Sequence, residues 1–272
     1  MEGSQANRTP KKSPKKRKRT STTSDHFKSP TSTKRKKQKT GTTGRVPAGQ
    51  SAVIFPPTTA DSFGIVQERL WQDPFSLLIA VLFLNKTAGK SSMPVYREVI
   101  KKYPTPEALS KANWDELFGM VKRLGLQTQR TNKLIKLANH WVDKPPEVGV
   151  RYRTLHYPAQ GDGKQWKPSH VEGDAEDCAG ALEIGKLPGC GRYARDSWRI
   201  FCRDVLRGVA SDYNGKDAVE GFEPEWKRVL PEDKELRAFL RWMWLKEGFV
   251  WDEMTGEKHA AGPDLLEKAR LG

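Results

Sequence analysis

The stretch Leu187-Pro188-Gly189-Cys190-Gly191-Arg192-Tyr193 decides how this sequence is interpreted. Its two glycines form a short Gly-x-Gly turn, and apolar periodicity predicts helices before and after it, at about 180–186 and 191–205. A turn of this kind exposes backbone N–H groups that can bind one DNA phosphate without reading any base. The turn has low specificity by itself, so its meaning depends on the rest of the chain.

Positive charge is concentrated at the N-terminus. Of the 48 Lys and Arg residues in this 272-residue chain, 15 lie in residues 1–50, which hold only two acidic residues. The remaining 33 basic and 31 acidic residues nearly balance. Nucleic-acid binding by the folded part must therefore depend on a local patch, while the N-terminal segment attracts DNA non-specifically.

Residues 1–55 are predicted to form a disordered basic tail, because apolar periodicity is missing and Lys, Arg, Ser, Thr, Pro and Gly dominate. Its two basic clusters, residues 10–19 and 34–39, are typical of nuclear import signals and DNA tethers. A solvated polycation that serves only solubility is the alternative. We expect a nuclear protein.

Cysteine and histidine patterns argue against metal chemistry. Cys178, Cys190 and Cys202 form no Cys-x-x-Cys pair, and the five histidines lack zinc-binding spacing. Three scattered cysteines cannot supply the four ligands of an iron–sulfur cluster. They suit a reducing, intracellular compartment. No apolar run approaches the roughly 18 residues that cross a bilayer, so we expect no membrane association.

Helical patterns dominate the rest of the chain, which is predicted to be all-α. Residues 75–84 are apolar on nearly every face and fit either a buried helix or a strand, and their helical neighbours favour a helix. Two stretches without periodicity, 145–180 and 207–225, are interpreted as insertions. The helical domain is expected over 56–255 and a C-terminal tail over 256–272. Further helices are expected at 94–102, 105–111, 113–124, 128–142 and 235–246.

Four stretches resemble the helix–hairpin–helix (HhH-GPD) superfamily of DNA glycosylases. More closely, the chain resembles the glycosylase domain of the methyl-CpG-binding-protein type of mismatch thymine/uracil glycosylase. The resemblance implies a two-lobed helical fold with a helix–hairpin–helix motif. The four stretches are residues 65–68 (IVQE), 73–87, 124–126 (LGL), and 187–201 together with 231–233 (PED).

Asp233 is the residue to which the resemblance gives the central catalytic role. Cleavage of a nucleoside C1′–N bond builds positive charge on the sugar, which a nearby carboxylate can stabilise while it orients the attacking water. Local sequence alone favours Asp233 as a cap for the helix expected at 235–246, and the resemblance favours catalysis instead. Its distance of 40 residues from Tyr193 is longer than the resemblance implies, which fits an insertion at 207–225.

Two further residues are expected at the base pocket. Tyr193 occupies the place where bifunctional relatives carry a Schiff-base lysine, and a phenol cannot form an imine, so the resemblance implies a monofunctional enzyme. Gln67 matches the glutamine that binds the flipped pyrimidine through its amide donor and acceptor. Tyr193 as a core or surface side chain, and Gln67 as a solvated one, are the alternatives.

The resemblance also implies a DNA-binding set. Leu126 corresponds to an apolar wedge in the base stack, or else closes a helix end. Lys86 stands where the family usually has an arginine that fills the space of the flipped base, and lysine stacks less well. The hairpin residues Gly189, Cys190, Gly191 and Arg192 would hold a phosphate, with a possible monovalent cation between backbone and phosphate and no other cofactor.

These expectations describe a monomeric DNA glycosylase of base-excision repair. Its substrate would be double-stranded DNA with a G·T or G·U mismatch, and downstream repair proteins would be further partners. A preference for another damaged base is one alternative. A non-catalytic helix–hairpin–helix DNA-binding module is the other, although such a module requires neither Asp233 nor Gln67.

Overall fold

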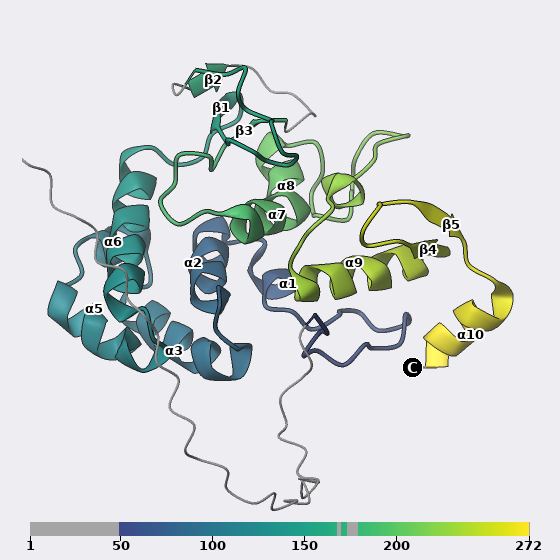
Figure 1. Ribbon diagram of the computed structural model, residues 1–272, viewed down its shortest axis with the longest axis horizontal. Coiled ribbons are helices and arrows are strands. Elements are labelled where there is room, and N and C mark those ends of the chain that lie inside the picture. The colour runs from purple at the N-terminus through teal and green to yellow at the C-terminus, as the bar shows by residue number, and fades with distance from the viewer. Residues whose placement is uncertain (1–48, 168–169, 173–178, 272) are drawn as a thin grey trace, which may run out of the picture. The chain divides into compact units, whose positions relative to one another are not determined.

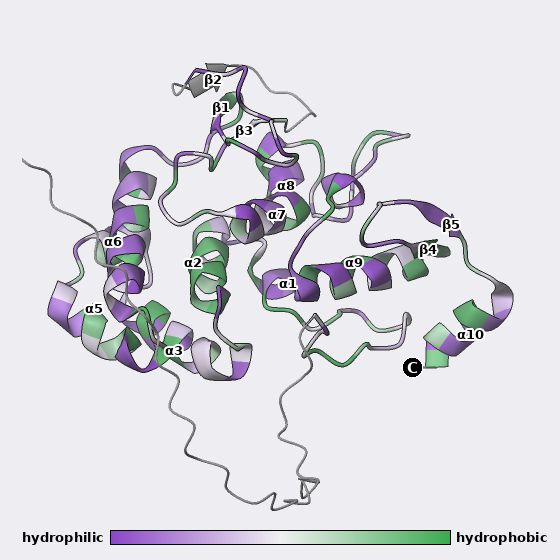
Figure 2. Ribbon diagram, in the orientation of Figure 1, coloured by the Kyte–Doolittle hydropathy of each residue, from purple (hydrophilic) through white to green (hydrophobic). Residues whose placement is uncertain are grey.

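Helix α2 (Pro74–Leu84) lies at the centre of the helical core in the computed structural model (Figure 1). The structure describes residues 49–167, 170–172 and 179–271. The Asp73 side chain accepts a hydrogen bond from the Ser76 backbone N–H at 3.0 Å, and Pro74 fills the first turn. Nine of the eleven residues of α2 are buried, so the apolar stretch is a buried helix, as its neighbours predicted (Figure 2).

Short helices pack around α2 and confirm the predicted all-α class. Helices α1, α3, α6 and α7 contact α2 directly, while α5 packs on α3 and α6 (Figure 1). The helices among the described residues are α1 (Gln67–Leu70), α3 (Gly89–Lys102), α4 (Pro106–Ser110), α5 (Trp114–Val121), η1 (Lys122–Leu124), α6 (Gln127–Asp143), α7 (Arg192–Phe201), α8 (Arg203–Arg207), η2 (Glu225–Arg228), α9 (Lys234–Lys246) and α10 (Pro263–Leu271).

Capping side chains set several of these boundaries. Thr105 accepts from the Ala108 N–H at 3.2 Å at the start of α4, and Asn113 accepts from the Glu116 N–H at 3.0 Å at the start of α5. Helix α5 continues into the 3₁₀ turn η1 and ends at Gly125, whose φ is +73°. The chain then enters α6 through Leu126, and this corner places Leu126 at the surface.

Five short strands were not expected from the sequence. Strands β1 (Val150–Arg153), β2 (His170–Glu172) and β3 (Ala181–Leu182) form an antiparallel sheet in the order β2-β1-β3. Strands β4 (Phe249–Trp251) and β5 (Lys258–Ala260) form a hairpin after α9. The stretch 145–180, expected to be irregular, therefore contains β1 and β2. These strands are stabilised by pairing between segments that are distant in the sequence. The local periodicity of a sequence does not reveal such pairing.

The helix expected at about 180–186 is wrong. Residues 181–182 form β3, which pairs with β1 through Tyr152 and Leu182, and turns follow up to the hairpin. A Cβ on Gly180 would lie 2.2 Å from the Gly163 nitrogen, and one on Gly185 would lie 2.2 Å from the Tyr152 oxygen. These close backbone approaches hold the segment against the sheet, and an isolated two-turn helix is too short to compete.

Both ends of the helical domain extend further than expected. The expected tail included residues 51–55, but the Ala52 N–H donates to Glu235 Oε1 at 2.9 Å and the Phe55 ring packs on Phe63 at 5.8 Å. Residues 1–48 of that tail, with both basic clusters, lie outside the described residues. Residues 256–272 were expected as a tail and contain β5 and α10. The Thr58 N–H donates to the Ala269 oxygen at 2.8 Å.

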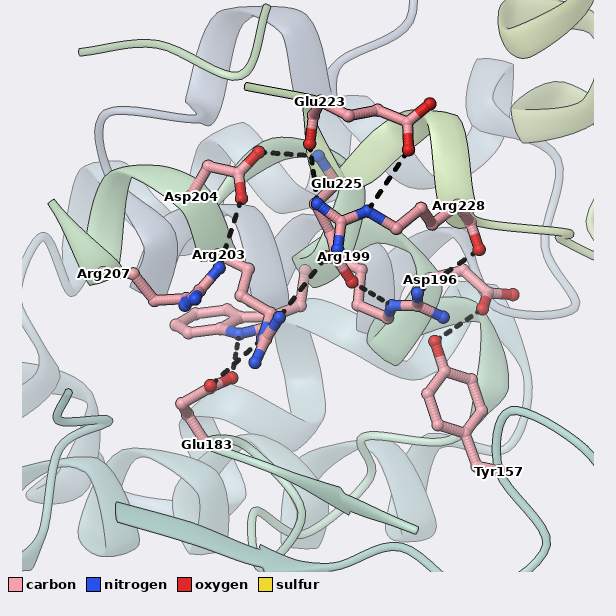
Figure 3. A network of polar contacts seen from close by, with 11 residues as sticks. Tyr157, Glu183, Asp196, Arg199, Arg203, Asp204, Arg207, Glu223, Glu225 and Arg228 are labelled. Atoms are coloured by element: carbon pink, nitrogen blue, oxygen red, sulfur yellow. Dashed lines mark hydrogen bonds and ion pairs between the residues drawn. The ribbon is translucent and has the colours of Figure 1, made fainter. Parts of the chain in front are cut away.

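A buried charge network connects the hairpin region to the segment before α9 (Figure 3). Arg203 is fully buried and lies between Glu183 and Glu225, with N···O distances of 3.1 and 3.3 Å. Arg199 Nε lies 2.5 Å from Glu225 Oε1. Because buried charges are costly unless paired, this network fixes α7 and α8 relative to residue 225 and the chain that follows it.

No helix within the described part of the chain has the length and apolar character needed to cross a membrane.

Candidate functional site

The hairpin at residues 187–191 is a tight turn held by its own backbone. The Leu187 N–H donates to the Ile184 oxygen at 3.0 Å, and the Cys190 N–H donates to the Leu187 oxygen at 3.2 Å. Gly191 then begins α7, because its oxygen accepts from the Arg195 N–H at 3.0 Å. The structure therefore has the turn and the second helix of the expected motif, and β3 with its following turns replaces the first helix.

The two hairpin glycines serve different purposes. Gly189 has a φ of +90°, and a Cβ there would lie 2.8 Å from Leu82 Cδ2 on α2. Gly189 is therefore required by the fold. Gly191 has an ordinary φ of −76°, and a Cβ there would meet no atom within 4 Å. Nothing in the folded chain requires glycine at 191, which leaves the backbone accessible from outside.

Gln67 and Tyr193 come together in the interior, although 126 residues separate them in the sequence. The Gln67 side chain is 2% exposed, and its Nε2 donates to the Tyr193 hydroxyl at 2.9 Å and to Ser197 Oγ at 3.4 Å. Gln67 is thus not a solvated side chain. Ser197 was not singled out from the sequence, although it lies one helical turn after Tyr193 on the same face of α7.

Asp233 is the N-cap of α9. Its Oδ1 accepts from the Glu235 N–H at 2.9 Å and from the Leu236 N–H at 3.2 Å. Both bonds use the same oxygen, so Oδ2 takes no part in the cap. The capping interpretation of Asp233 is therefore confirmed, and the geometry leaves its second carboxylate oxygen for another task.

Burial raises the pKa of both Asp233 and Tyr193. Desolvation raises the pKa of the Asp233 carboxyl, and the two N–H groups that bind its carboxylate oppose this shift. Desolvation also raises the pKa of the Tyr193 phenol, and the nearby negative charge of Asp233 raises it further. Tyr193 is therefore a neutral hydroxyl that lies within the electrostatic range of Asp233.

The hairpin side chains Cys190 and Arg192 face the protein. Burial raises the pKa of the Cys190 thiol to about 12, which excludes a reactive thiolate at neutral pH. Arg192 pairs with Glu232 at 3.1 Å and also donates to the Pro158 carbonyl. Arg192 thus connects the start of α7 to residues next to Asp233, and its contact with DNA stays a prediction.

Lys86 and Leu126 share an uncommon backbone conformation. Lys86 has a φ of +59° and Leu126 a φ of +50°, in the left-handed region that residues with a Cβ rarely adopt. The Leu126 side chain is 56% exposed, so it does not close a helix end by burial. Both residues line one open cavity. Its wall is completed by Leu82, Asn85, Gln129, Arg130 and Lys133.

Lys133 is a basic residue that the sequence analysis missed. It lines the cavity beside Leu126, and its Cδ lies 3.5 Å from the position of a Cβ on Gly189. Lys133 therefore lies between the hairpin and the cavity. The sequence places it on α6 as one of several lysines, and only the fold distinguishes it from the others.

Comparison with known proteins gives partial matches. No family model matches the chain. Over 68 residues, 25% of this chain, it is 40% identical to the thymine-DNA glycosylase of Aeropyrum pernix, and over 70 residues it is 36% identical to the thymine/uracil-DNA glycosylase of Pyrobaculum aerophilum. Over 182 residues, 67% of this chain, it is 24% identical to a methyl-CpG-binding domain protein 4-like protein of Arabidopsis thaliana.

The resemblance to DNA glycosylases is confirmed. The matched stretches span 30%, 30% and 28% of the length of these three relatives. The similarity therefore concerns a limited part of each protein, and the roles of individual residues in this chain stay predictions.

The described residues hold no group of three or more His, Cys, Asp or Glu side chains that could bind a metal ion. Cys178 lies outside the described residues.

Proposed function

We propose that this chain is a monofunctional DNA glycosylase that hydrolyses the N-glycosidic bond of thymine or uracil mispaired with guanine. The observation that carries the proposal is the buried pairing of Gln67 with Tyr193, beside the charge of Asp233. A binding module that only holds DNA requires no buried amide with a half-buried phenol and a half-buried carboxylate near it. The thymine- and uracil-specific names of the two archaeal relatives support the same substrate class.

The base pocket would recognise a flipped pyrimidine by hydrogen bonds. The Gln67 amide oxygen can accept from the N3–H of thymine or uracil, and Nε2 can donate to a base carbonyl by giving up its longer 3.4 Å contact with Ser197. Tyr193 fixes the amide in place at 2.9 Å. Because Tyr193 has no amine, it cannot form the imine through which a lyase cleaves the DNA strand.

Asp233 would carry the hydrolysis. As the C1′–N bond breaks, positive charge develops on the sugar, and the Asp233 carboxylate stabilises it and orients a water molecule for attack at C1′. The helix N-terminus holds Oδ1, so the carboxylate is positioned before substrate arrives. The departing base leaves with the electrons of the bond, and the products are a free base and an abasic site.

The hairpin would hold the DNA strand by one phosphate. The N–H groups of Cys190 and Gly191 donate within the turn, and the open approach at Gly191 would bring a phosphate to the N–H groups in the first turn of α7. The open space at Gly191 also fits a monovalent cation that supplies one positive charge toward the phosphate. Lys86 and Leu126 would hold the duplex open, with Leu126 between the bases.

The setting of this activity follows from the charge distribution. The basic clusters at residues 10–19 and 34–39 support nuclear import and non-specific attraction to DNA. We therefore propose a monomeric nuclear enzyme that acts on double-stranded DNA with G·T or G·U mismatches. The abasic product requires further base-excision-repair proteins to process it.

An excision assay tests the proposal. The protein is incubated with G·T, G·U and lesion-bearing duplexes, and alkali then cleaves the abasic sites. We expect strand cleavage at G·T and G·U and none with Asp233→Asn. Asparagine caps a helix as well as aspartate does, so this variant should fold. Asp73→Asn, at the cap of α2, is the matched control and should stay active.

Four outcomes would contradict the proposal. Release of no base from any duplex would indicate a DNA-binding module, and full activity of Asp233→Asn would remove the carboxylate from the mechanism. Trapping of a covalent protein–DNA adduct with borohydride would show lyase chemistry. Release of a damaged base in preference to thymine and uracil would change the substrate class.

A further inference from the structure

Arg130 contacts both of the surface corners that carry Lys86 and Leu126. Its Nη1 donates to the backbone oxygens of Leu82, at 2.5 Å, and Phe83, at 3.2 Å. Its Nη2 donates to Thr87 Oγ1 at 2.9 Å. These acceptors lie at the end of α2 and just after Lys86, so the guanidinium spans the corner from which Lys86 projects.

The second corner is joined to the same residue through the backbone. The Arg130 N–H donates to the Leu126 oxygen at 2.8 Å, which closes the first turn of α6. Leu126 is the residue before α6, so its position is fixed by this turn. One residue therefore holds Leu126 by its main chain and the surroundings of Lys86 by its side chain.

The chemistry of Arg130 suits this arrangement. Arg130 is only 6% exposed, and its planar fork reaches three separate oxygen acceptors, which the ammonium of a lysine cannot do in one plane. Two of the acceptors are carbonyls at the C-terminal end of α2, where the helix dipole favours a positive charge. These contacts offset the cost of burying the guanidinium, and that cost is reflected in a lowered Arg130 pKa.

The backbone at both corners needs such support. Left-handed conformations at residues with a Cβ cost free energy and persist only where surrounding contacts determine them. Lys86, at +59°, and Leu126, at +50°, are both in this region. Arg130 also lines the cavity that Lys86 and Leu126 share.

We propose that Arg130 is a positioning residue that holds Lys86 and Leu126 at a fixed spacing, so that both enter the base stack together. The proposal rests on the proposed function for its consequence in DNA, but its structural claim is testable without DNA.

Amide hydrogen exchange tests the structural claim on the full chain. Arg130→Lys keeps the main-chain bond to Leu126 and should raise exchange at Asn85 and Thr87, whose N–H groups donate to Val81 and Leu84, while α9 keeps its protection. Thr87→Val removes the hydroxyl that accepts from Arg130, together with its longer 3.4 Å bond to the Asn85 oxygen, and should raise exchange at 85–88 to a smaller extent. The matched control is Arg123→Lys, because Arg123 is an exposed arginine paired with Glu98 close to the same corner.

Unchanged exchange at 85–88 in both variants would overturn the proposal. If Arg130→Lys also lowers the exchange protection of α9, the whole protein has been destabilised. The Thr87→Val variant then decides whether the effect at residues 85–88 is local. Local exchange in Thr87→Val supports positioning, and its absence contradicts it. This result does not depend on catalysis, so a protein that releases no base would contradict the proposed function alone.

A second readout follows the DNA. A 2-aminopurine next to a G·U mismatch becomes more fluorescent when its stack is opened, and anisotropy reports binding separately. At saturating protein, we expect Arg130→Lys to give a much smaller fluorescence rise than the native chain, and single-turnover excision slower by about tenfold or more. Equal fluorescence with weaker binding would indicate a merely structural role and would overturn the proposal.

Discussion

Asp233 uses one carboxylate oxygen to cap α9 and leaves the other outside the cap. The N–H groups of Glu235 and Leu236 both bind Oδ1, so the carboxylate is held at the start of α9 without help from substrate. A catalytic carboxylate that is fixed in advance loses less conformational entropy when the reaction begins. The capping and catalytic interpretations of this residue are therefore compatible.

Gly191 permits a prediction at the same scale. Because a Cβ at Gly191 would meet no protein atom, Gly191→Ala should leave thermal stability within about 1 kcal/mol of the native chain. The new methyl group would stand where we expect the phosphate, so the affinity for duplex DNA should fall, as measured by anisotropy. Gly119→Ala on α5 is the control, since it also has open space. Unchanged DNA affinity in Gly191→Ala would show that the hairpin does not contact the DNA.

Asp196 gives a prediction about pH. Burial raises the pKa of its carboxyl to about 6, against the opposing hydrogen bond from the Tyr157 hydroxyl. A carboxyl with a raised pKa stabilises the fold when protonated, so this contribution is present below about pH 4 and is lost as pH rises to about 6. Asp204, with a pKa also raised to about 6 by burial, adds a contribution of the same sign.

Asp196→Asn should therefore reduce the pH dependence. An amide keeps an oxygen for the Tyr157 hydroxyl and cannot ionise, so the variant should gain stability relative to the native chain as pH rises from 4 to 7. The gain should be on the order of 2 kcal/mol at most. Urea denaturation at several pH values measures it. Parallel curves for the two proteins would contradict this account of Asp196.

At the scale of elements, the charge network positions the segments that carry the site. Glu225 is fully buried and pairs with Arg199 and Arg203, which come from α7 and α8. Helix α7 carries Tyr193, and the chain after η2 leads to Asp233. The network therefore sets the distance between the phenol and the carboxylate through rigid helices rather than through the irregular stretch 207–225.

Glu225→Gln tests the network. The amide leaves two buried guanidinium groups without their shared negative charge, so the free energy of unfolding should fall by about 3 to 5 kcal/mol. Urea denaturation followed by tryptophan fluorescence measures this loss. Glu98→Gln, which breaks an exposed pair with Arg123, should cost less than about 1 kcal/mol. Equal losses in the two variants would show that burial does not decide the strength of these pairs.

The elements also show why some sequence expectations failed. The apolar run 75–84 and the caps at Thr105 and Asn113 are local signals, and the structure contains the helices they predicted. The helix expected at 180–186 does not form, because Gly180 and Gly185 pack against backbone atoms that lie more than 15 residues away in the sequence. The sequence contains no local mark of such contacts, and the β4–β5 hairpin was missed for the same reason.

At the scale of the whole molecule, the residues of the candidate site fall into two groups: those that the sequence identified and those that only the fold reveals. Gln67, Tyr193 and Asp233 were found because their local stretches resemble those of a known family. The sequence did not identify Arg130, Lys133 and Ser197. Each is an ordinary helix residue, and only the fold places it beside another segment. Burial of Arg130 in particular contradicts the usual exposure of arginine, so only the three-dimensional contacts reveal it.

The uneven distribution of charge along the chain leads to a prediction about the whole protein. Residues 1–50 carry 15 basic and two acidic residues, while the rest is nearly balanced. Replacing the Lys and Arg residues of 10–19 and 34–39 by Gln should make DNA affinity much less salt-dependent, because fewer counterions are released. Excision at saturating protein should be unchanged. A salt dependence equal to that of the native chain would place the attraction in the helical domain.

The exposed Leu126 side chain lowers the stability of the free protein, and burial of this side chain against DNA would offset that loss. More than half of this side chain faces water, at a corner whose backbone is itself unfavourable. Full burial of a leucine is worth about 2 kcal/mol, so the unbound fold forgoes roughly 1 kcal/mol at this position. A base stack that closes over Leu126 would return that amount, against the few kcal/mol needed to unstack a base pair. In the proposed function, part of the work of opening the duplex would therefore be done when the protein folds, before it meets any DNA.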